Sequence, residues 1–201
     1  MKIIGLTGPS GAGKTRFSFF LCAMGYPCIN ADELYHSMLV PPSTLLDAIR
    51  DKFGDSYFES SGELDRKALG KFVFSDPANL ELLNATVLPI VIEKMQKIAK
   101  DYEKNGAKIL VIDAPTLFEA GYDKSCDITV SILAPKELRV TRISERDNID
   151  TNDALLRIKA QKSESFYKEH SDLIIINDSD ENALKSKAEA LIKKLLAGEN
   201  L

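Results

Sequence analysis

Residues 8–15 read Gly-Pro-Ser-Gly-Ala-Gly-Lys-Thr and match the phosphate-binding pattern G-x-x-x-x-G-K-[ST] at every fixed position. Glycines in such a loop let backbone N–H groups turn toward a phosphate without Cβ clashes. Lys14 is placed to reach the β- and γ-phosphates of a nucleoside triphosphate, and the Thr15 hydroxyl to ligate Mg²⁺. The residues expected to bind the nucleotide are Gly8, Ser10, Gly11, Ala12, Gly13, Lys14 and Thr15.

The segments on either side of this loop come in the order that a P-loop requires. Residues 2–6 form a short apolar run that is readable as a buried strand. After the loop, apolar side chains recur at the spacing of an amphipathic helix, and Gly25 stands where that helix should stop. These apolar side chains are Phe17, Phe20, Leu21 and Met24. Strand, loop and helix together favour a phosphate site over a glycine-rich turn that matches by chance.

Two aspartates follow predicted strands and have chemical as well as structural interpretations. Asp32 comes after the second strand, where a kinase carboxylate can orient the attacking hydroxyl or accept its proton. The alternative is a helix N-cap, a position that aspartate favours. Asp113 ends the run Ile-Leu-Val-Ile, the place of a Walker-B acid that holds Mg²⁺. The alternative for Asp113 is a cap on the turn that contains Pro115.

Three arginines fall at i, i+3 and i+7 on one face of a predicted helix: Arg139, Arg142 and Arg146. Aligned guanidinium groups suit a polyphosphate, and during phosphoryl transfer they neutralise developing charge. The alternative is a solvated face whose arginines pair with Glu137, Glu145 and Asp147. With a P-loop in the same chain, we expect the segment to be a mobile lid over the nucleotide.

The order of the remaining elements predicts an α/β fold of the P-loop NTPase type, with a five-stranded parallel sheet and helices on both faces. Apolar runs without polar alternation suit strands that are covered on both sides. After residues 2–6, the runs expected to be strands are 27–30, 108–113, 127–133 and 172–177. Leu184, Ala188, Leu191, Ile192 and Leu195 have helical spacing and predict a final helix that closes one face.

The chain is expected to be one domain, residues 1–201, with two helical insertions that leave from the carboxyl ends of strands, the edge where ligands bind in such sheets. The core comprises residues 1–32, 106–134 and 171–201. The insertion 33–105 is expected to bind the acceptor, and the insertion 135–170 to be the lid. Pro89 is expected to start the last helix of the first insertion.

Composition limits the class of protein. The 201 residues are 44% hydrophobic and 28% charged, with a net charge of −4, which are globular values that predict no nucleic-acid partner. No apolar run approaches the ~18 residues of a membrane span, and we expect no membrane partner. Cys22, Cys28 and Cys126 lack zinc-site spacing and are expected to be buried or free thiols in a cytoplasmic protein. No heptad seam assigns an oligomeric state.

With these residues laid out, the chain resembles the dephospho-coenzyme A kinases over nearly its full length. Ala31-Asp32 matches the family's second-strand motif, and residues 53–74 match its Phe-Gly…Gly-x-Leu-Asp-Arg…Leu…Val-Phe signature. Further matches are Leu83-Asn84 with Pro89-Ile90, Asp113-x-Pro115-x-Leu117-Phe118-Glu119, Arg142-x-x-x-Arg146-Asp147, Gln161, Lys168 and Asn177. Departures are Asn30 for an acid, Leu88 for histidine, Thr116 for leucine, and Asp178-Ser179 without the usual glycine.

The resemblance implies that ATP, with Mg²⁺, phosphorylates the ribose 3′-hydroxyl of dephospho-coenzyme A to give coenzyme A and ADP. The catalytic residues implied are Asp32, Lys14, Arg142 and Arg146, with Arg139 assisting ATP binding. Thr15 and Asp113 would hold Mg²⁺. The residues implied to contact the acceptor are Asp32, Arg66, Pro115 and Glu119.

Two other interpretations have their own sequence signatures. Another small-molecule P-loop kinase, for nucleosides, nucleotides or shikimate-like acceptors, would use almost the same residues, and residues 62–74 favour dephospho-coenzyme A instead. A nucleotide-dependent switch would show Asn-Lys-x-Asp and Asp-x-x-Gly, and an ABC-type ATPase would show Leu-Ser-Gly-Gly. The chain has none of these in the expected places.

Overall fold

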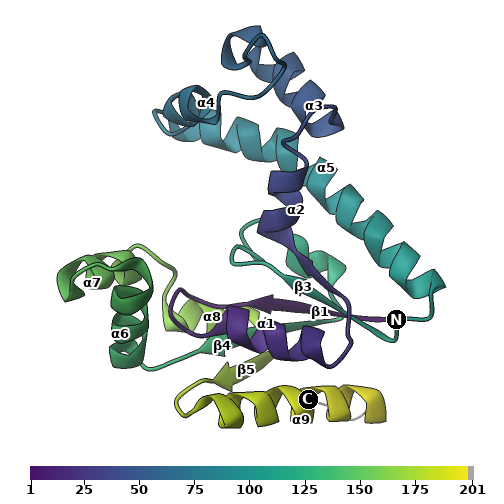
Figure 1. Cartoon of the computed structure of the whole chain (residues 1–201), viewed down its shortest axis with the longest axis vertical. Coiled ribbons are helices and arrows are strands. Elements are labelled where there is room, and N and C mark those ends of the chain that lie inside the picture. The colour runs from purple at the N-terminus through teal and green to yellow at the C-terminus, as the bar shows by residue number, and fades with distance from the viewer. Residues whose placement is uncertain (199–201) are drawn as a thin grey trace. The chain divides into compact units, whose positions relative to one another are not determined.

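The structure is a computed structural model that describes residues 1–198 of the chain (Figure 1). It divides into two compact units. One consists of Met1–Ile29 and the chain from Tyr102 onward, and the other consists of Asn30–Asp101.

The first unit is built on a parallel sheet whose five strands have the order β2-β3-β1-β4-β5. Each strand falls within one residue of the predicted run: β1 (Lys2–Thr7), β2 (Cys28–Asn30), β3 (Ile109–Asp113), β4 (Ile128–Leu133) and β5 (Leu173–Ile176). In the register of β1, Leu6 lies opposite Asp113 and Thr7 lies opposite Ser131. The carboxyl ends of β1, β3 and β4 therefore meet at one edge, next to the loop that follows Thr7.

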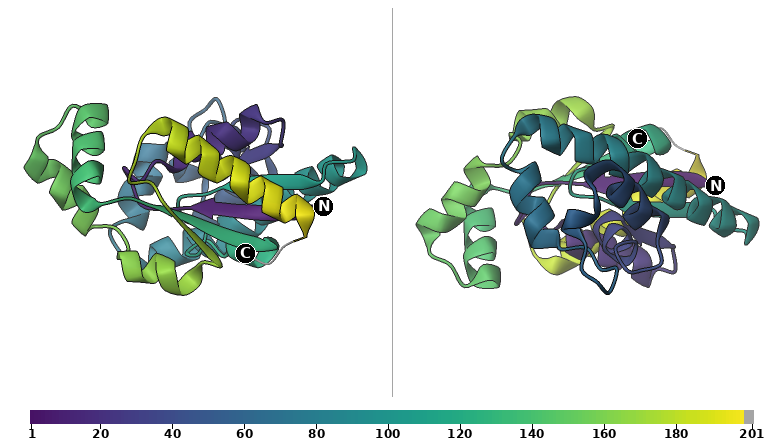
Figure 2. Two further views of the ribbon diagram at one scale, coloured as in Figure 1. Left: turned by 90° about the horizontal axis from the view of Figure 1, so that it is seen from below. Right: turned by 90° about the horizontal axis from the view of Figure 1, so that it is seen from above.

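Helices cover both faces of this sheet, as the apolar runs predict. Every residue of β3 and β4 is buried. Ile4 and Leu6 join the core beneath α1 (Lys14–Ala23) and α9 (Glu181–Ala197), which pack against each other. Seen from below, α9 lies over the strands, and α8 (Glu164–His170) packs against β4 and β5 (Figure 2). The predicted apolar stripe of the last helix is buried at all five positions, so its assignment is confirmed.

Two shorter helices follow β4 in the segment expected to be the lid. They are α6 (Lys136–Asp147) and α7 (Thr151–Lys159), which pack against each other. Asn148 ends α6 in the left-handed conformation, a region that asparagine tolerates. A short 3-10 helix, η2 (Tyr122–Ser125), precedes β4. Among the helices of residues 1–198, none is both long and apolar enough to cross a bilayer.

The second unit is helical. It contains α2 (Ala31–Ser37), α3 (Thr44–Phe53), η1 (Asp55–Tyr57), α4 (Arg66–Val73) and most of α5 (Pro77–Lys104). Both α3 and α4 pack against η1. Phe72 of α4 forms aromatic contacts with Phe53 and Tyr57, with ring centroids 6.3 and 5.6 Å apart. These contacts join α4 to both α3 and η1.

The expectation that Pro89 starts a helix is wrong, because α5 runs without a break from Pro77 to Lys104 and contains Pro89 in its interior. Proline removes one N–H from the helix ladder and crowds the carbonyl four residues earlier. In α5, Val87, Val91, Met95 and Ala99 are all buried at four-residue spacing. This buried stripe stays in register across the proline, so burial outweighs the loss of one hydrogen bond.

The expectation of free thiols is wrong for Cys22 and Cys28, which form a disulfide with their Cα atoms 6.0 Å apart. The turn at Gly25, where φ is +89°, ends α1 and returns the chain toward β2, which brings the two cysteines together. Cys126 is free, and burial is the main cause that raises its pKa to about 12. An odd number of cysteines concealed this pair from sequence inspection.

A thiol count tests the disulfide. Protein that is purified and denatured without reductant should be alkylated by iodoacetamide at one cysteine per chain, Cys126. After reduction it should be alkylated at three cysteines. Mass spectrometry reads the count directly, and a Cys126→Ser control should then take up none before reduction. Three modified cysteines without reductant would show that the pair is not formed in the purified protein.

Candidate functional site

The loop between β1 and α1 is packed so closely against its neighbours that side chains are excluded. Gly8 has φ +145°, and a Cβ there would lie 2.3 Å from the Ile132 carbonyl oxygen at the end of β4. Gly13 has φ +96°, stands at the N-cap of α1, and would place a Cβ 2.2 Å from Nδ2 of Asn177. Only glycine fits both conformations and both contacts. The loop is therefore fixed between the ends of β4 and β5, with its backbone N–H groups at a helix start.

Asn177 supports the loop from the end of β5. Its side chain is buried, and Nδ2 donates a hydrogen bond of 2.8 Å to the Ala12 carbonyl. Its backbone N–H donates to the Leu133 carbonyl at 2.7 Å. Sequence reasoning gave Asn177 no role beyond a family match. The available signal was a polar residue directly after the Ile174–Ile176 run, where this strand reaches the ligand edge.

The three arginines of α6 all contact the P-loop, so they do not form a purely solvated face. Arg139 Nε donates to the Ser10 carbonyl at 3.0 Å, and Arg142 Nη1 donates to the Gly11 carbonyl at 3.2 Å. Arg146 Nη2 donates to the Ser10 hydroxyl at 3.2 Å. Arg146 also pairs with its neighbour Asp147, at 2.7 Å from Nε, which holds the pKa of that carboxyl below its usual range. Arg146 thus contacts the P-loop and also pairs with an acidic neighbour on its own helix.

Gln161 lies in the segment expected to be the lid and contacts the P-loop, a contact that the sequence analysis did not predict. Its Oε1 accepts hydrogen bonds from the Ser10 backbone N–H at 3.0 Å and from Arg139 Nη2 at 2.9 Å. Partial burial lowers the pKa of the Arg139 guanidinium. The Ser10 N–H is a candidate phosphate donor, so a phosphate that binds there takes the place of Gln161.

Lys14 and Asp113 form an ion pair at the edge where β1 and β3 meet. Both are largely buried, with side chains 13% and 6% exposed. The Lys14 ammonium is the candidate charge for nucleotide phosphates, and Asp113 is its counter-charge in this structure. Within residues 1–198, the side-chain hydrogen bond of Asp113 goes to Lys14 and not to the turn that follows β3.

The donor set at this position suits Mg²⁺. Thr15 offers a hydroxyl and Asp113 a carboxylate, which are the hard oxygen ligands that this ion prefers. No group of three or more His, Cys, Asp or Glu side chains gathers as a metal site within the part of the chain that the structure describes. Mg²⁺ is typically bound through one or two carboxylates plus substrate phosphates and water, so this sparse set fits.

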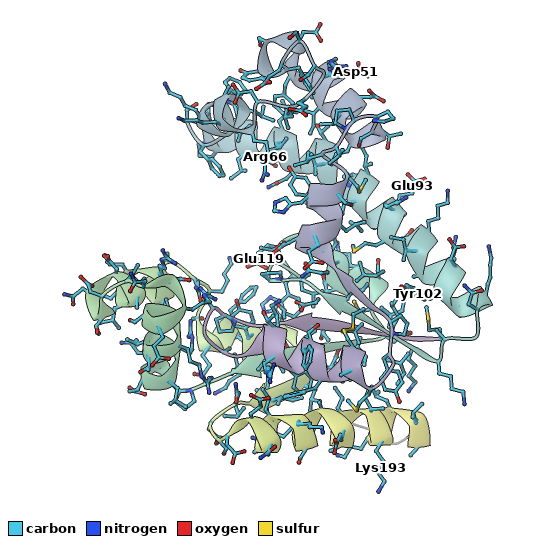
Figure 3. All side chains as sticks on the ribbon, viewed as in Figure 1. Asp51, Arg66, Glu93, Tyr102, Glu119 and Lys193 are labelled. Carbon is cyan, nitrogen blue, oxygen red and sulfur yellow. A yellow bond between two sulfur atoms is a disulfide. The ribbon has the colours of Figure 1, made fainter. Side chains whose placement is uncertain are left out.

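The loop after β3 carries the two acceptor candidates of this unit, Pro115 and Glu119. The Thr7 hydroxyl donates to the Pro115 carbonyl at 3.0 Å and ties that loop to the end of β1. Glu119 is labelled in Figure 3. Burial, and secondly the charge of Glu119, raise the pKa of Tyr167 on α8. Both candidates thus lie in a loop that is attached to the P-loop strand.

Asp32 and Arg66 lie in the unit formed by Asn30–Asp101. Asp32 is not the N-cap of α2. Asn30 takes that position, and its Oδ1 accepts from the backbone N–H groups of Asp32 and Glu33 at 3.0 and 3.1 Å. The Asp32 side chain is exposed in the first turn of α2. Its carboxylate is left available for chemistry because the neighbouring asparagine performs the capping.

Comparison with known proteins identifies the family. The model of the dephospho-CoA kinase family matches residues 2–183. A dephospho-CoA kinase of Dehalococcoides mccartyi is 33% identical over 98% of each chain. The structure of the Campylobacter jejuni dephospho-CoA kinase covers 98% of this chain and 99% of its own, with a TM-score of 0.72 at 25% identity.

A more distant similarity extends to other kinases. A shikimate kinase of Acinetobacter baumannii covers 98% of this chain and 94% of its own, with a TM-score of 0.52 at 17% identity, and so shares the fold. The family match, by contrast, covers the P-loop, Asp32, Asp113 and the lid segment together. The chain belongs to the dephospho-CoA kinase family.

Proposed function

We propose that this chain transfers the γ-phosphoryl group of ATP to the ribose 3′-hydroxyl of dephospho-coenzyme A, giving coenzyme A and ADP, the last step of coenzyme A biosynthesis. The observation that carries this proposal is the convergence of the three lid arginines on the P-loop beside the Lys14–Asp113 pair. Family membership supports the identity of the acceptor and a cytoplasmic setting.

In the proposed reaction, Asp32 orients the acceptor hydroxyl and takes its proton. A bond forms between the 3′-oxygen and the γ-phosphorus, the bond from that phosphorus to the β–γ bridging oxygen breaks, and ADP leaves. Lys14, Arg142 and Arg146 stabilise the negative charge on the transferred group. Mg²⁺, when bound by Thr15 and Asp113, adds neutralising charge at the phosphates.

The two helical insertions have complementary roles in this proposal. Residues 33–105 bind the acceptor, with Asp32 and Arg66 as contacts, and Pro115 and Glu119 add contacts from the loop after β3. Residues 135–170 form the lid, in which Arg139 helps to hold ATP. Enclosure by both segments aligns the reactants and excludes water, which limits wasteful hydrolysis of ATP.

The choice of acceptor is tested with a panel. Purified protein with Mg-ATP should release ADP with dephospho-coenzyme A and give only background rates with a nucleoside or shikimate. A coupled assay for ADP measures each rate. Transfer to the nucleoside, with background rates on dephospho-coenzyme A, would instead assign a different small-molecule kinase, and tight ATP binding without any transfer would favour a nucleotide-dependent switch.

Asp32→Asn should retain the wild-type affinity for ATP and lower kcat by roughly 10²–10⁴-fold, because the amide cannot accept the proton of the hydroxyl. Glu33→Gln is the matched control, since Glu33 is the adjacent exposed carboxylate, and its amide oxygen can still accept the hydrogen bond from Asn30. Steady-state kinetics on both variants measure the difference. Near-normal turnover of Asp32→Asn would refute the role of this carboxylate.

Asn177→Ala should weaken ATP binding by about tenfold, because loss of the amide leaves the buried Ala12 carbonyl without its donor and loosens the loop. Asp178→Asn, a change at the next residue on the exposed surface, is the control and should bind ATP normally. Equilibrium binding of a non-hydrolysable ATP analogue measures both. Unchanged affinity in Asn177→Ala would show that the loop holds its shape without this side chain.

A further inference from the structure

His36 and Arg66 meet on the helical unit that carries Asp32. Nη2 of Arg66 lies 3.2 Å from Nε2 of His36, and both side chains are exposed. Arg66 begins α4, which Asp65 caps by accepting from two backbone N–H groups. His36 lies in the last turn of α2. His36 and Arg66, which have 29 residues between them in the sequence, thus bring a ring nitrogen and a guanidinium into contact. Arg66 is labelled in Figure 3.

The direction of this hydrogen bond follows from chemistry. A guanidinium has only donors, so Nε2 of His36 must be the acceptor, and the ring is then neutral with its proton on Nδ1. The bond fixes one edge of the guanidinium, and no other hydrogen bond of this side chain occurs within residues 1–198. Among residues 1–198, no carboxylate forms an ion pair with Arg66, so its charge is not neutralised within the described chain. An exposed, oriented and unneutralised guanidinium is a ready site for an anion.

The position of the pair relative to Asp32 suggests which anion. Asp32 and His36 are four residues apart on α2 and therefore lie on the same helix face, one turn apart. In dephospho-coenzyme A, the 3′-hydroxyl and the 5′-diphosphate belong to the same ribose, and only C4′ separates C3′, which bears the hydroxyl, from C5′, which bears the diphosphate. A hydroxyl at Asp32 would therefore bring the diphosphate near the next turn of the helix.

We infer that Arg66 binds the 5′-diphosphate of the acceptor and that His36 is the positioning residue that orients its guanidinium. This inference rests on the proposed function. Tyr35 is the neighbouring titratable group. Its ring centroid lies 5.8 Å from that of His36, and the charge of Arg66 opposes the rise that burial causes in the pKa of Tyr35. The charge of Arg66 thus acts on a residue of α2, the helix that also carries Asp32.

Steady-state kinetics on variants of the full chain test the inference. Arg66→Met should raise the KM for dephospho-coenzyme A by at least tenfold, while the KM for ATP stays within twofold. His36→Met should raise the same acceptor KM by a few-fold. His36→Gln should restore it to within twofold of wild type, because the amide oxygen accepts from Arg66. Lys67→Met removes an adjacent exposed charge as a control and should leave both KM values unchanged.

A double-mutant cycle separates positioning from a general structural effect. Because His36 acts through Arg66, the double variant Arg66→Met/His36→Met should be no worse than Arg66→Met alone. Additive losses, a rise in the KM for ATP, or no rescue by glutamine would each overturn the inference. If the wild type does not phosphorylate dephospho-coenzyme A, both the proposed function and this inference are wrong. If it does, and the acceptor KM is unchanged in Arg66→Met, this inference alone fails.

Discussion

The structure depends on how closely the backbone of the P-loop approaches its neighbours. Gly8 lies against the Ile132 carbonyl and Gly13 against the Asn177 amide, with no room for a Cβ at either place. These contacts fix the loop to the ends of β4 and β5, and the parallel sheet fixes those ends relative to β1. The sheet thus acts as the rigid support for a loop whose own sequence has high conformational freedom.

The groups proposed to bind phosphate already have partners within the protein. Asp113 neutralises Lys14, Gln161 accepts from the Ser10 N–H, and the lid arginines donate to loop carbonyls and a hydroxyl. In the proposed binding mode, an incoming triphosphate replaces some of these partners and offers stronger, charge-assisted ones in return. The arrangement keeps buried charges paired and keeps the lid arginines within reach of the loop.

Much of the fold could be predicted from local patterns, because strands buried on both sides appear as continuous apolar runs and the buried stripe of α9 appears as helical spacing. The errors came where tertiary packing overrode local chemistry. Burial of one face keeps α5 helical through Pro89, and the turn after α1 brings Cys22 and Cys28 close enough to form a disulfide. The candidate site also contains some features that local patterns predict and others that depend on tertiary packing. The P-loop, Asp113 and the arginine face are visible as patterns, whereas Gln161 and the His36–Arg66 contact depend on side chains that only the folded chain brings together.

The most direct test of the central claim, that the P-loop holds a nucleotide by its terminal phosphates, is a calorimetric titration of the wild-type protein with Mg-ATP and with AMP. Charge-assisted bonds to Lys14, the loop N–H groups and the lid arginines should make ATP bind at least ~100-fold more tightly than AMP, because each such bond contributes about 1.5–3 kcal/mol. Equal affinities for ATP and AMP would contradict the account, since the loop would then contribute nothing to binding.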